Sequence, residues 1–376
     1  MKRLVAVLLP AILLSSHLIC FAQNSGKSNQ EIVIGERFSL FSKALNEDRE
    51  VFISLPSNYN RNQHKYPVIF VLDAEYLFEI TNGIVKIKVS RNEMPESIVV
   101  GIPNSPGKRY DMAMPLSYPD GRTFFGDADG KKIKDYLKFV GEELNNYLEN
   151  NYKVNPHRTI IGMSPTFGPV LEAFWNQPDL FDGYIVLAAE LAVKTTSGKT
   201  IQERVLHAIQ EPERSKCAVY IGKASDDLKR RPKEEALAYV ELNQRLERTA
   251  NPKINYRIEI LKNENHYGMA TLGIKHGLEN IYPFSTWTIP YRDFWEARNP
   301  AKEIRQFYDK LSAQYGFEIL PLEDSFYAAQ TLSGTARRLK RQGKNKEAQE
   351  VLQLALKYYP NSPYLKRMYS DTTSSE

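Results

Sequence analysis

Arg158-Thr159-Ile160-Ile161-Gly162-Met163-Ser164-Pro165-Thr166-Phe167-Gly168 is the stretch that decides the fold. An apolar run leads into a tight turn and then into a segment with a helical pattern. A nucleophilic serine is held on such a strand-to-helix turn with its hydroxyl exposed, and Ser164 has that position. The glycine expected two residues later is Thr166. The main functional question is therefore whether Ser164 is a working nucleophile.

Short runs rich in Val, Ile and Leu recur on both sides of this turn. Several of them lack polar alternation, which is typical of strands buried on both faces. Helical patterns lie between the runs, as in a mostly parallel sheet covered by helices. The predicted strands are residues 50–55, 67–72, 97–102, 158–162, 183–187, 217–222 and 255–260.

The segments between the strands are of two kinds. Residues 131–151 place apolar side chains at spacings of three and four, which predicts an amphipathic helix, and residues 236–248 predict a second. Residues 103–129 are rich in Pro, Gly, Asp and Tyr without periodicity. We expect a long irregular loop there, and such loops are often functional.

The pattern changes beyond residue 290. Residues 31–290 form the predicted α/β domain, and residues 300–368 form a predicted helical extension, with helices at 307–316, 323–343 and 345–359. Gly343, Ala348 and Pro360 occur where one tetratricopeptide unit has its turn, second helix and end. A single unit cannot bury its own apolar face, so the extension should pack on the main domain. A plain helical cap and a repeat-like binding module both fit this pattern.

The first 22 residues have the features of a secretory signal peptide. Basic Lys2 and Arg3 precede the apolar run 4–21, and cleavage after Ala22 is expected. An uncleaved anchor is the alternative, although the run is short for a bilayer span. The protein is thus expected to be exported, to the periplasm or outside the cell. Only Cys217 then remains, so no internal disulfide is expected.

The amino-acid composition restricts the classes of molecule that the protein is expected to bind. The 50 basic and 45 acidic residues give a net charge of +5 without a long basic block, which does not indicate nucleic acid. No apolar run of membrane-spanning length follows residue 21. We expect no membrane span in the mature chain, a monomer or weak dimer, a small-molecule or saccharide ester as substrate, and no cofactor or metal.

A serine nucleophile needs a histidine base within hydrogen-bond reach. His266 lies in the loop 262–268 directly after the last predicted strand, where such a base is expected. An ordinary loop histidine is the alternative. His64 and His157 are interpreted as solvated turn residues, and His207 and His276 fall on helical patterns.

The acid that orients the base should come between the serine and the histidine in the chain. Asp226 and Asp227 follow the strand predicted at 217–222. Asp226 is the first choice and Asp227 the second, because the sequence does not say which side chain turns inward. Either aspartate could instead favour the start of a helix, where negative charge is stabilising.

The oxyanion of the tetrahedral intermediate also needs hydrogen-bond donors. The amide after the nucleophile is usually one of them, but Pro165 has no N–H. Other donors must then serve, and the amides of Ala74, Glu75 or Tyr76, after the strand 67–72, are the predicted ones.

Several separate blocks, in order, resemble the esterase group that includes enterochelin esterase, S-formylglutathione hydrolase and feruloyl or acetyl xylan esterases. They are residues 49–56, 66–75, 98–104 and 109–111, the Ser164 turn and the His266 loop. The resemblance implies an α/β-hydrolase fold, a Ser-His-acid triad and an oxyanion loop at Ala74 and Glu75, with Ala74 in place of the usual glycine. The group typically has Gly-His-Ser-x-Gly-Gly at the elbow, from which Met163, Pro165, Thr166 and Phe167 depart.

The sequence is consistent with two alternative functions. The first is an exported serine ester hydrolase with the triad Ser164, His266 and Asp226, acting on an ester of a sugar, siderophore or small acyl compound. The second is a weakly catalytic or inactive relative that uses the same fold for binding, as Pro165 and Thr166 suggest.

Overall fold

The computed structural model describes residues 31–110, 112–117, 123–124 and 131–373. The signal peptide predicted at residues 1–22 lies outside the described residues, as do parts of the predicted loop 103–129. Among the described helices, none is both long and apolar enough to cross a membrane.

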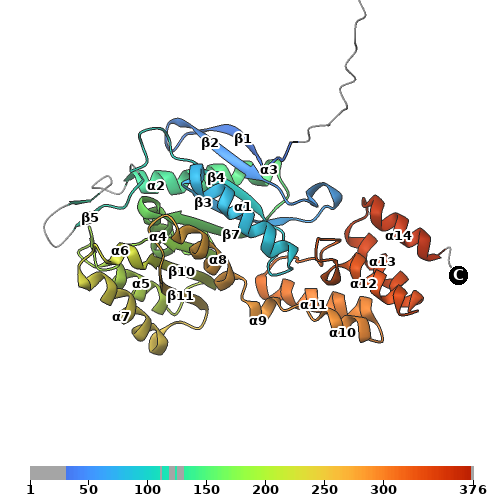
Figure 1. Ribbon diagram of the computed structural model, residues 1–376. Helices are drawn as coiled ribbons and strands as arrows, with labels where there is room; N and C mark the ends of the chain where they lie inside the picture. The colour runs from blue at the N-terminus through green and yellow to red at the C-terminus, as the bar shows by residue number, and fades with distance from the viewer. Residues whose placement is uncertain (1–30, 111, 118–122, 125–130, 374–376) are drawn as a thin grey trace, which may run out of the picture. The chain divides into compact units, whose positions relative to one another are not determined.

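A central sheet organises the described chain (Figure 1). Its order is β1-β2-β4-β3-β7-β8-β10-β11. The strands β1 and β2 form an antiparallel pair and β2 is antiparallel to β4, whereas β4, β3, β7, β8, β10 and β11 run parallel. The bounds are β1 Glu36–Ser42, β2 Glu47–Ser54, β3 Tyr66–Leu72, β4 Ile98–Ile102, β7 Val154–Met163, β8 Gly183–Leu187, β10 Cys217–Ala224 and β11 Ile254–Leu261.

This topology confirms the predicted mostly parallel α/β sheet, and each predicted strand is present. The strand β1 was not predicted. It lies at the edge of the sheet and most of its residues are at least partly exposed. An edge strand of this kind has few continuous apolar residues, which is the signal by which the other strands were found.

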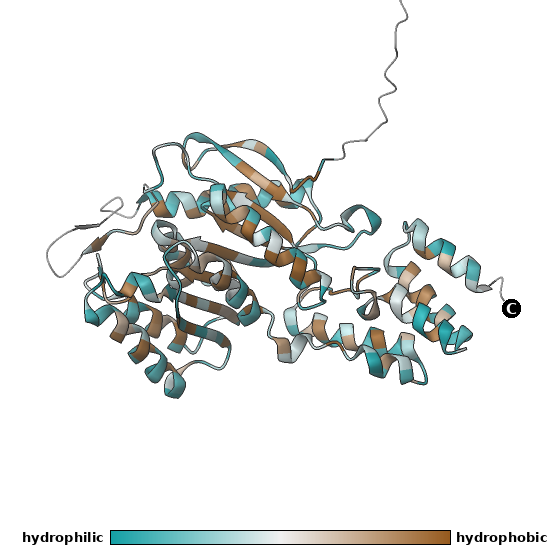
Figure 2. Ribbon diagram, in the orientation of Figure 1, coloured by the Kyte–Doolittle hydropathy of each residue, from teal (hydrophilic) through white to brown (hydrophobic). Residues whose placement is uncertain are grey.

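Helices cover both faces of the sheet (Figure 1). On β3, Val68 and Phe70 contribute to one core with α2, α4, α5 and α7, while Ile69 and Val71 contribute to the other with α1 and α8. Figure 2 shows the strands as the most hydrophobic part of the fold. These helices are α1 Ala74–Ser90, α2 Lys131–Lys138, α4 Phe167–Asn176, α5 Ile201–Gln210, α7 Lys233–Thr249 and α8 Met269–Ile281.

The helix predicted at 131–151 is helical throughout, but a π-helical segment at Phe139–Leu144 separates α2 from α3 (Asn145–Asn151). A small second sheet joins β5 (Leu116–Ser117), β6 (Thr123–Phe124) and β9 (Lys194–Thr195). The short elements are the helix α6 (Ser225–Leu228) and 3-10 turns at Tyr59–Arg61, Ser164–Thr166 and Ala328–Gln330.

The helices predicted at 307–316 and 345–359 are present and share the second core. The helix predicted at 323–343 is wrong in its first part. Residues 323–331 form bends and turns, and the helix begins at Leu332, where the Thr331 hydroxyl caps it by accepting a hydrogen bond from the Gly334 amide. Asn92 donates hydrogen bonds of 2.9 Å to the Tyr308 hydroxyl and to the Gln330 carbonyl, and Arg61 pairs with the buried Glu323 at 3.2 Å. Thus the extension packs on the α/β part, as expected. Its helices are α9 Phe284–Trp287, α10 Tyr291–Glu296, α11 Pro300–Tyr315, α12 Leu332–Arg341, α13 Asn345–Tyr358 and α14 Pro363–Thr373. The similarity of α12 and α13 to a tetratricopeptide unit stays a prediction.

The structure corrects the interpretation of two histidines. The side chains of His64 and His157 are buried and not solvated. His157 lies on β7 and contacts the rings of Tyr282 and Phe317, while Nδ1 of His64 lies 3.2 Å from Glu318. Both histidines bind the extension to the sheet, a tertiary contact that their local sequence does not reveal.

Candidate active site

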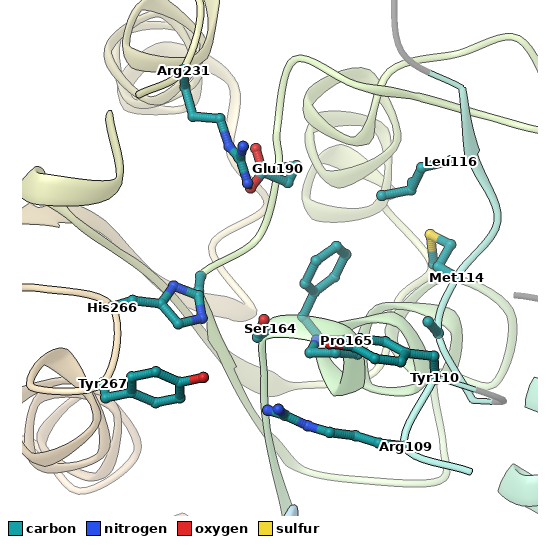
Figure 3. Close-up of a pocket in the computed structure, with 13 residues that line it drawn as sticks. Arg109, Tyr110, Met114, Leu116, Ser164, Pro165, Glu190, Arg231, His266 and Tyr267 are labelled. Carbon is teal, nitrogen blue, oxygen red and sulfur yellow. The ribbon is translucent and has the colours of Figure 1, made fainter. Parts of the chain in front are cut away.

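A pocket of about 260 Å³ lies at the carboxyl ends of the parallel strands. Ser164 and His266 both line it, and Figure 3 shows the serine hydroxyl and the imidazole facing one another across it. Ser164 follows β7 and His266 follows β11, which are well separated in the sheet order. The other described residues that line the pocket include Arg109, Tyr110, Phe167, Glu190, Arg231 and Tyr267.

Ser164 has the strained backbone of a nucleophile elbow. Its φ is 56°, in the left-handed region that residues with a Cβ rarely adopt. Gly162 makes the tight turn possible, because a Cβ there would lie 2.4 Å from the carbonyl oxygen of Thr166. The chain passes from Met163 through one 3-10 turn directly into α4. Strain of this kind is typical of functional sites.

The imidazole of His266 is held by a carboxylate. Its Nδ1 lies 2.8 Å from Oδ2 of Asp227, and the two loops are joined by the Asp226 amide, which donates to the Glu264 carbonyl at 3.1 Å. This contact leaves Nε2 as the nitrogen that faces Ser164. The structure thus brings Asp227 to the histidine and not the first choice, Asp226. The Asp226 carboxylate pairs with Lys229 at 2.9 Å on the surface.

Charged side chains surround Asp227. Burial opposes its ionisation, but the hydrogen bond from His266 and the charge of Lys223 together hold the pKa of Asp227 below its usual range. The ammonium of Lys223 lies 4.0 Å from Asp227 and 3.0 Å from Glu190. Arg231 also pairs with Glu190, at 3.0 Å. Asp227 therefore stays charged at neutral pH.

Ala74 and Glu75, the predicted oxyanion residues, are not among the residues that line this pocket. The Ala74 side chain is buried, and the Glu75 carboxylate accepts hydrogen bonds from Asn104 at 2.7 and 3.2 Å. The described geometry therefore gives these two residues no contact with the pocket in front of Ser164.

Asp73, which sequence analysis did not select, lies directly behind the elbow. Its carboxylate is fully buried and accepts hydrogen bonds from Thr166 at 2.6 Å and Asn104 at 2.5 Å, with Arg109 Nε at 3.6 Å. Burial raises the pKa of Asp73, although these partners oppose the rise. Its position after a buried strand was a signal for it, but its role depends on residues distant in the chain.

Thr166 has a structural role in the elbow. Its hydroxyl donates to Asp73 and accepts from the Met163 amide at 2.9 Å. The side chain at the position of the usual glycine therefore makes one hydrogen bond inside the turn and one to Asp73 behind it. Among the described residues, no group of His, Cys, Asp and Glu is arranged to hold a metal ion.

Two curated proteins of Bacillus subtilis (strain 168) resemble part of the chain. Ferri-bacillibactin esterase BesA is 32% identical over 43% of this chain and 61% of its own length. The uncharacterized protein YjcH is 28% identical over 39% of this chain and 58% of its own length. The chain thus spans about three fifths of the curated relatives it matches.

Solved structures share the fold. The crystal structure of an IroE-like serine hydrolase from Shewanella oneidensis superposes with a TM-score of 0.68 at 18% identity, covering 86% of this chain and 99% of that one. The siderophore hydrolase EstB of Aspergillus nidulans gives a TM-score of 0.53 at 16% identity, covering 70% and 99%. These matches confirm the α/β-hydrolase fold.

The family model described as "Putative esterase" matches residues 42–268, which run from the end of β1 to the residue before α8. The match includes the Ser164 turn, both aspartates of the α6 loop and His266. It confirms the resemblance that the sequence blocks indicated. The chain belongs to this esterase family.

Proposed function

We propose that the protein is a serine hydrolase of carboxylic esters, with Ser164 as nucleophile, His266 as base and Asp227 as the acid that orients the base. One observation carries the proposal. A serine on a strained elbow and a histidine held by a partly buried carboxylate line the same pocket, and the three side chains come from the ends of three different strands. This constellation activates a hydroxyl that is otherwise a poor nucleophile.

The proposed reaction has two halves. Nε2 of His266 takes the hydroxyl proton while Oγ of Ser164 bonds to the ester carbonyl carbon and the carbonyl electron pair moves to oxygen. When the carbonyl re-forms, the ester C–O bond breaks and His266 gives its proton to the leaving alkoxide. Water then attacks the acyl carbon while His266 takes its proton. The bond to Oγ of Ser164 breaks as the carbonyl re-forms, and His266 returns the proton to Oγ, which releases the carboxylic acid. Asp227 remains ionised and stabilises the imidazolium.

The substrate class follows from the pocket and the relatives. A pocket of about 260 Å³ is at the small end for ligand sites and accepts one part of an ester, with Phe167 and Tyr110 as apolar and aromatic walls. BesA is named for a siderophore ester. We therefore propose an ester of a siderophore, sugar or small acyl compound. We also propose that the substrate is met outside the cytoplasm, because of the signal-like residues 1–22.

A second function is a binding protein without turnover, and Pro165 favours it. The residue after the nucleophile has no N–H, and loss of one oxyanion donor costs about two to three orders of magnitude in rate. This loss of rate is expected unless another hydrogen-bond donor replaces the amide.

Hydrolysis of short-chain nitrophenyl esters by residues 23–376 and by the Ser164→Ala variant separates the two functions. For an enzyme, we expect Ser164→Ala to lower kcat/KM by about 10³ or more, with circular dichroism unchanged. A fluorophosphonate should label Ser164, as read by peptide mass spectrometry. Equal rates in both forms and no label at Ser164 would leave the binding function as the better proposal.

A further inference from the structure

The elbow lacks its usual donor, and the expected replacements do not line the pocket. Pro165 cannot donate, and Ala74 and Glu75 are absent from the pocket wall. We propose that the guanidinium of Arg109, with the phenol of Tyr267 beside it, stabilises the oxyanion that forms when Ser164 attacks an ester. This inference rests on the proposed function and identifies further catalytic residues for it.

Arg109 and Tyr267 reach the site from two loops. Both line the pocket with Ser164 and His266. In Figure 3 the guanidinium of Arg109 and the hydroxyl of Tyr267 point toward the space in front of Ser164. An oxyanion must form in that space, because the carbonyl carbon that Ser164 attacks lies within bonding distance of its Oγ. A cation and a hydroxyl at this place suit developing negative charge.

Arg109 is held in advance of the reaction. Its Nε lies 3.6 Å from the buried Asp73 carboxylate, a terminal nitrogen lies 3.4 Å from the Tyr76 hydroxyl, and the guanidinium carbon lies 5.6 Å from the centre of the Tyr76 ring. Its side chain is 31% exposed. Burial is the largest single effect and disfavours the charge, but Asp73 and the neighbouring tyrosines Tyr76, Tyr267 and Tyr110 together raise the pKa of Arg109. The guanidinium is therefore charged and oriented before substrate binds.

The same carboxylate connects Arg109 to the elbow. One oxygen of Asp73 accepts from Thr166, two residues after Ser164, and the other faces Arg109. The two differences from the family pattern, at Pro165 and Thr166, are then linked through Asp73. The threonine that replaces glycine holds Asp73, and Asp73 holds the cation that compensates for the missing amide.

Arg109 has donors left for a ligand. A guanidinium carries five N–H groups, and among the residues that the structure describes, the contacts with Asp73, Tyr76 and Tyr267 do not use them all. Arg231 is the other arginine of the pocket wall, but its Nε and a terminal nitrogen lie 3.1 and 3.0 Å from Glu190. In Figure 3 this pair lies on the opposite side of His266 from Arg109. Arg109 is thus better placed to contact the oxyanion.

The test is a double-mutant cycle in which a backbone donor is restored. Arg109→Met should lower kcat for nitrophenyl butyrate by about 10²-fold to 10³-fold with KM changed less than about threefold. Arg109→Lys, which keeps the charge, should lose less. Adding Pro165→Ala to Arg109→Met should recover at least about tenfold, more than Pro165→Ala gains alone. Arg204→Met, which removes a half-buried guanidinium stacked on Trp175 outside the site, should change kcat less than about twofold.

A transition-state analogue gives a second readout. A trifluoromethyl ketone forms a tetrahedral adduct on Ser164, so its affinity should fall with kcat/KM across the Arg109 variants. A wild-type kcat in Arg109→Met would overturn the inference. The inference would also be overturned by a loss of kcat that Pro165→Ala does not recover and that leaves the analogue affinity unchanged, because such a loss is a structural effect. If Arg109→Met does not fold, Arg109→Lys with and without Pro165→Ala decides by the same criteria. Absence of Ser164-dependent turnover in the wild type would overturn the proposed function itself, which the other outcomes leave standing.

Discussion

Nδ1 of His266 lies 2.8 Å from Oδ2 of Asp227, whereas the carboxylate of the adjacent Asp226 lies 2.9 Å from Lys229 on the surface. We predict that Asp227→Asn lowers kcat for a nitrophenyl ester by about 10³-fold to 10⁴-fold, because the amide no longer stabilises the imidazolium or fixes its tautomer. Steady-state kinetics with circular dichroism as a folding check measures the effect.

Asp226→Asn is the matched control, one residue away with the same chemical change. Its carboxylate pairs with Lys229 on the surface, so we expect kcat within about threefold of wild type. Equal losses in the two variants, or a larger loss in Asp226→Asn, would contradict the assignment of Asp227.

The sequence predicted the sheet because buried parallel strands are continuous apolar runs. It also selected Ser164 and His266, which line one pocket, because each follows a predicted strand. Their roles in a triad stay a prediction. The sequence could not choose between Asp226 and Asp227. Both belong to α6, and their orientation is decided by the tertiary contact of Asp227 with His266, 39 residues later in the chain.

The proposed oxyanion site shows the same limit of sequence-based prediction. Family resemblance pointed to Ala74 and Glu75, whose role as oxyanion donors stays a prediction, whereas Arg109 and Tyr267, which we propose for that role, line the pocket. Arg109 lies within a segment without periodicity, and its position depends on the buried Asp73, 36 residues earlier in the chain. No local pattern encodes such a long-range pair.

Gly162 should be necessary for the elbow. In Gly162→Ala the new Cβ would lie 2.4 Å from the Thr166 carbonyl oxygen and 2.7 Å from a Val170 methyl group. We predict a loss of about 1–3 kcal/mol in the free energy of unfolding, measured by urea denaturation, together with a fall in kcat as Ser164 moves. Gly83→Ala is the control. No atom lies within 4 Å of its new Cβ on the exposed face of α1, so the variant should gain about 0.5–1 kcal/mol. A stable, fully active Gly162→Ala would refute the predicted clash.

The Thr166 hydroxyl should stabilise the folded protein, because it bonds both to Asp73 and to the Met163 amide. Thr166→Val removes the donor to Asp73 and the acceptor for the Met163 amide while it keeps the side-chain shape. We predict a loss of about 2–3 kcal/mol in the free energy of unfolding, since two buried groups lose a partner. Thr166→Ser keeps the hydroxyl and should lose less than half as much. A Thr166→Val variant as stable as wild type would show that these hydrogen bonds do not stabilise the turn.

Glu235 should make stability depend on pH. Its carboxylate is 2% exposed and accepts the amides of Leu191 and Ala192 at 2.6 and 2.9 Å, next to Glu190 in the pocket wall. Burial and the charge of Glu190 raise the pKa of Glu235 to about 7 from its usual 4.5. The folded state therefore binds a proton more tightly than the unfolded state does. The resulting contribution to the free energy of unfolding is complete below pH 4.5 and is lost as pH rises through about 7.

Between pH 5.5 and 8.5 the wild type should lose about 2 kcal/mol in the free energy of unfolding from this group. Glu235→Gln keeps an acceptor but does not titrate, so urea denaturation at the two pH values should show a smaller decline in the variant by about that amount. The same decline in both proteins would mean that Glu235 titrates normally in the folded state.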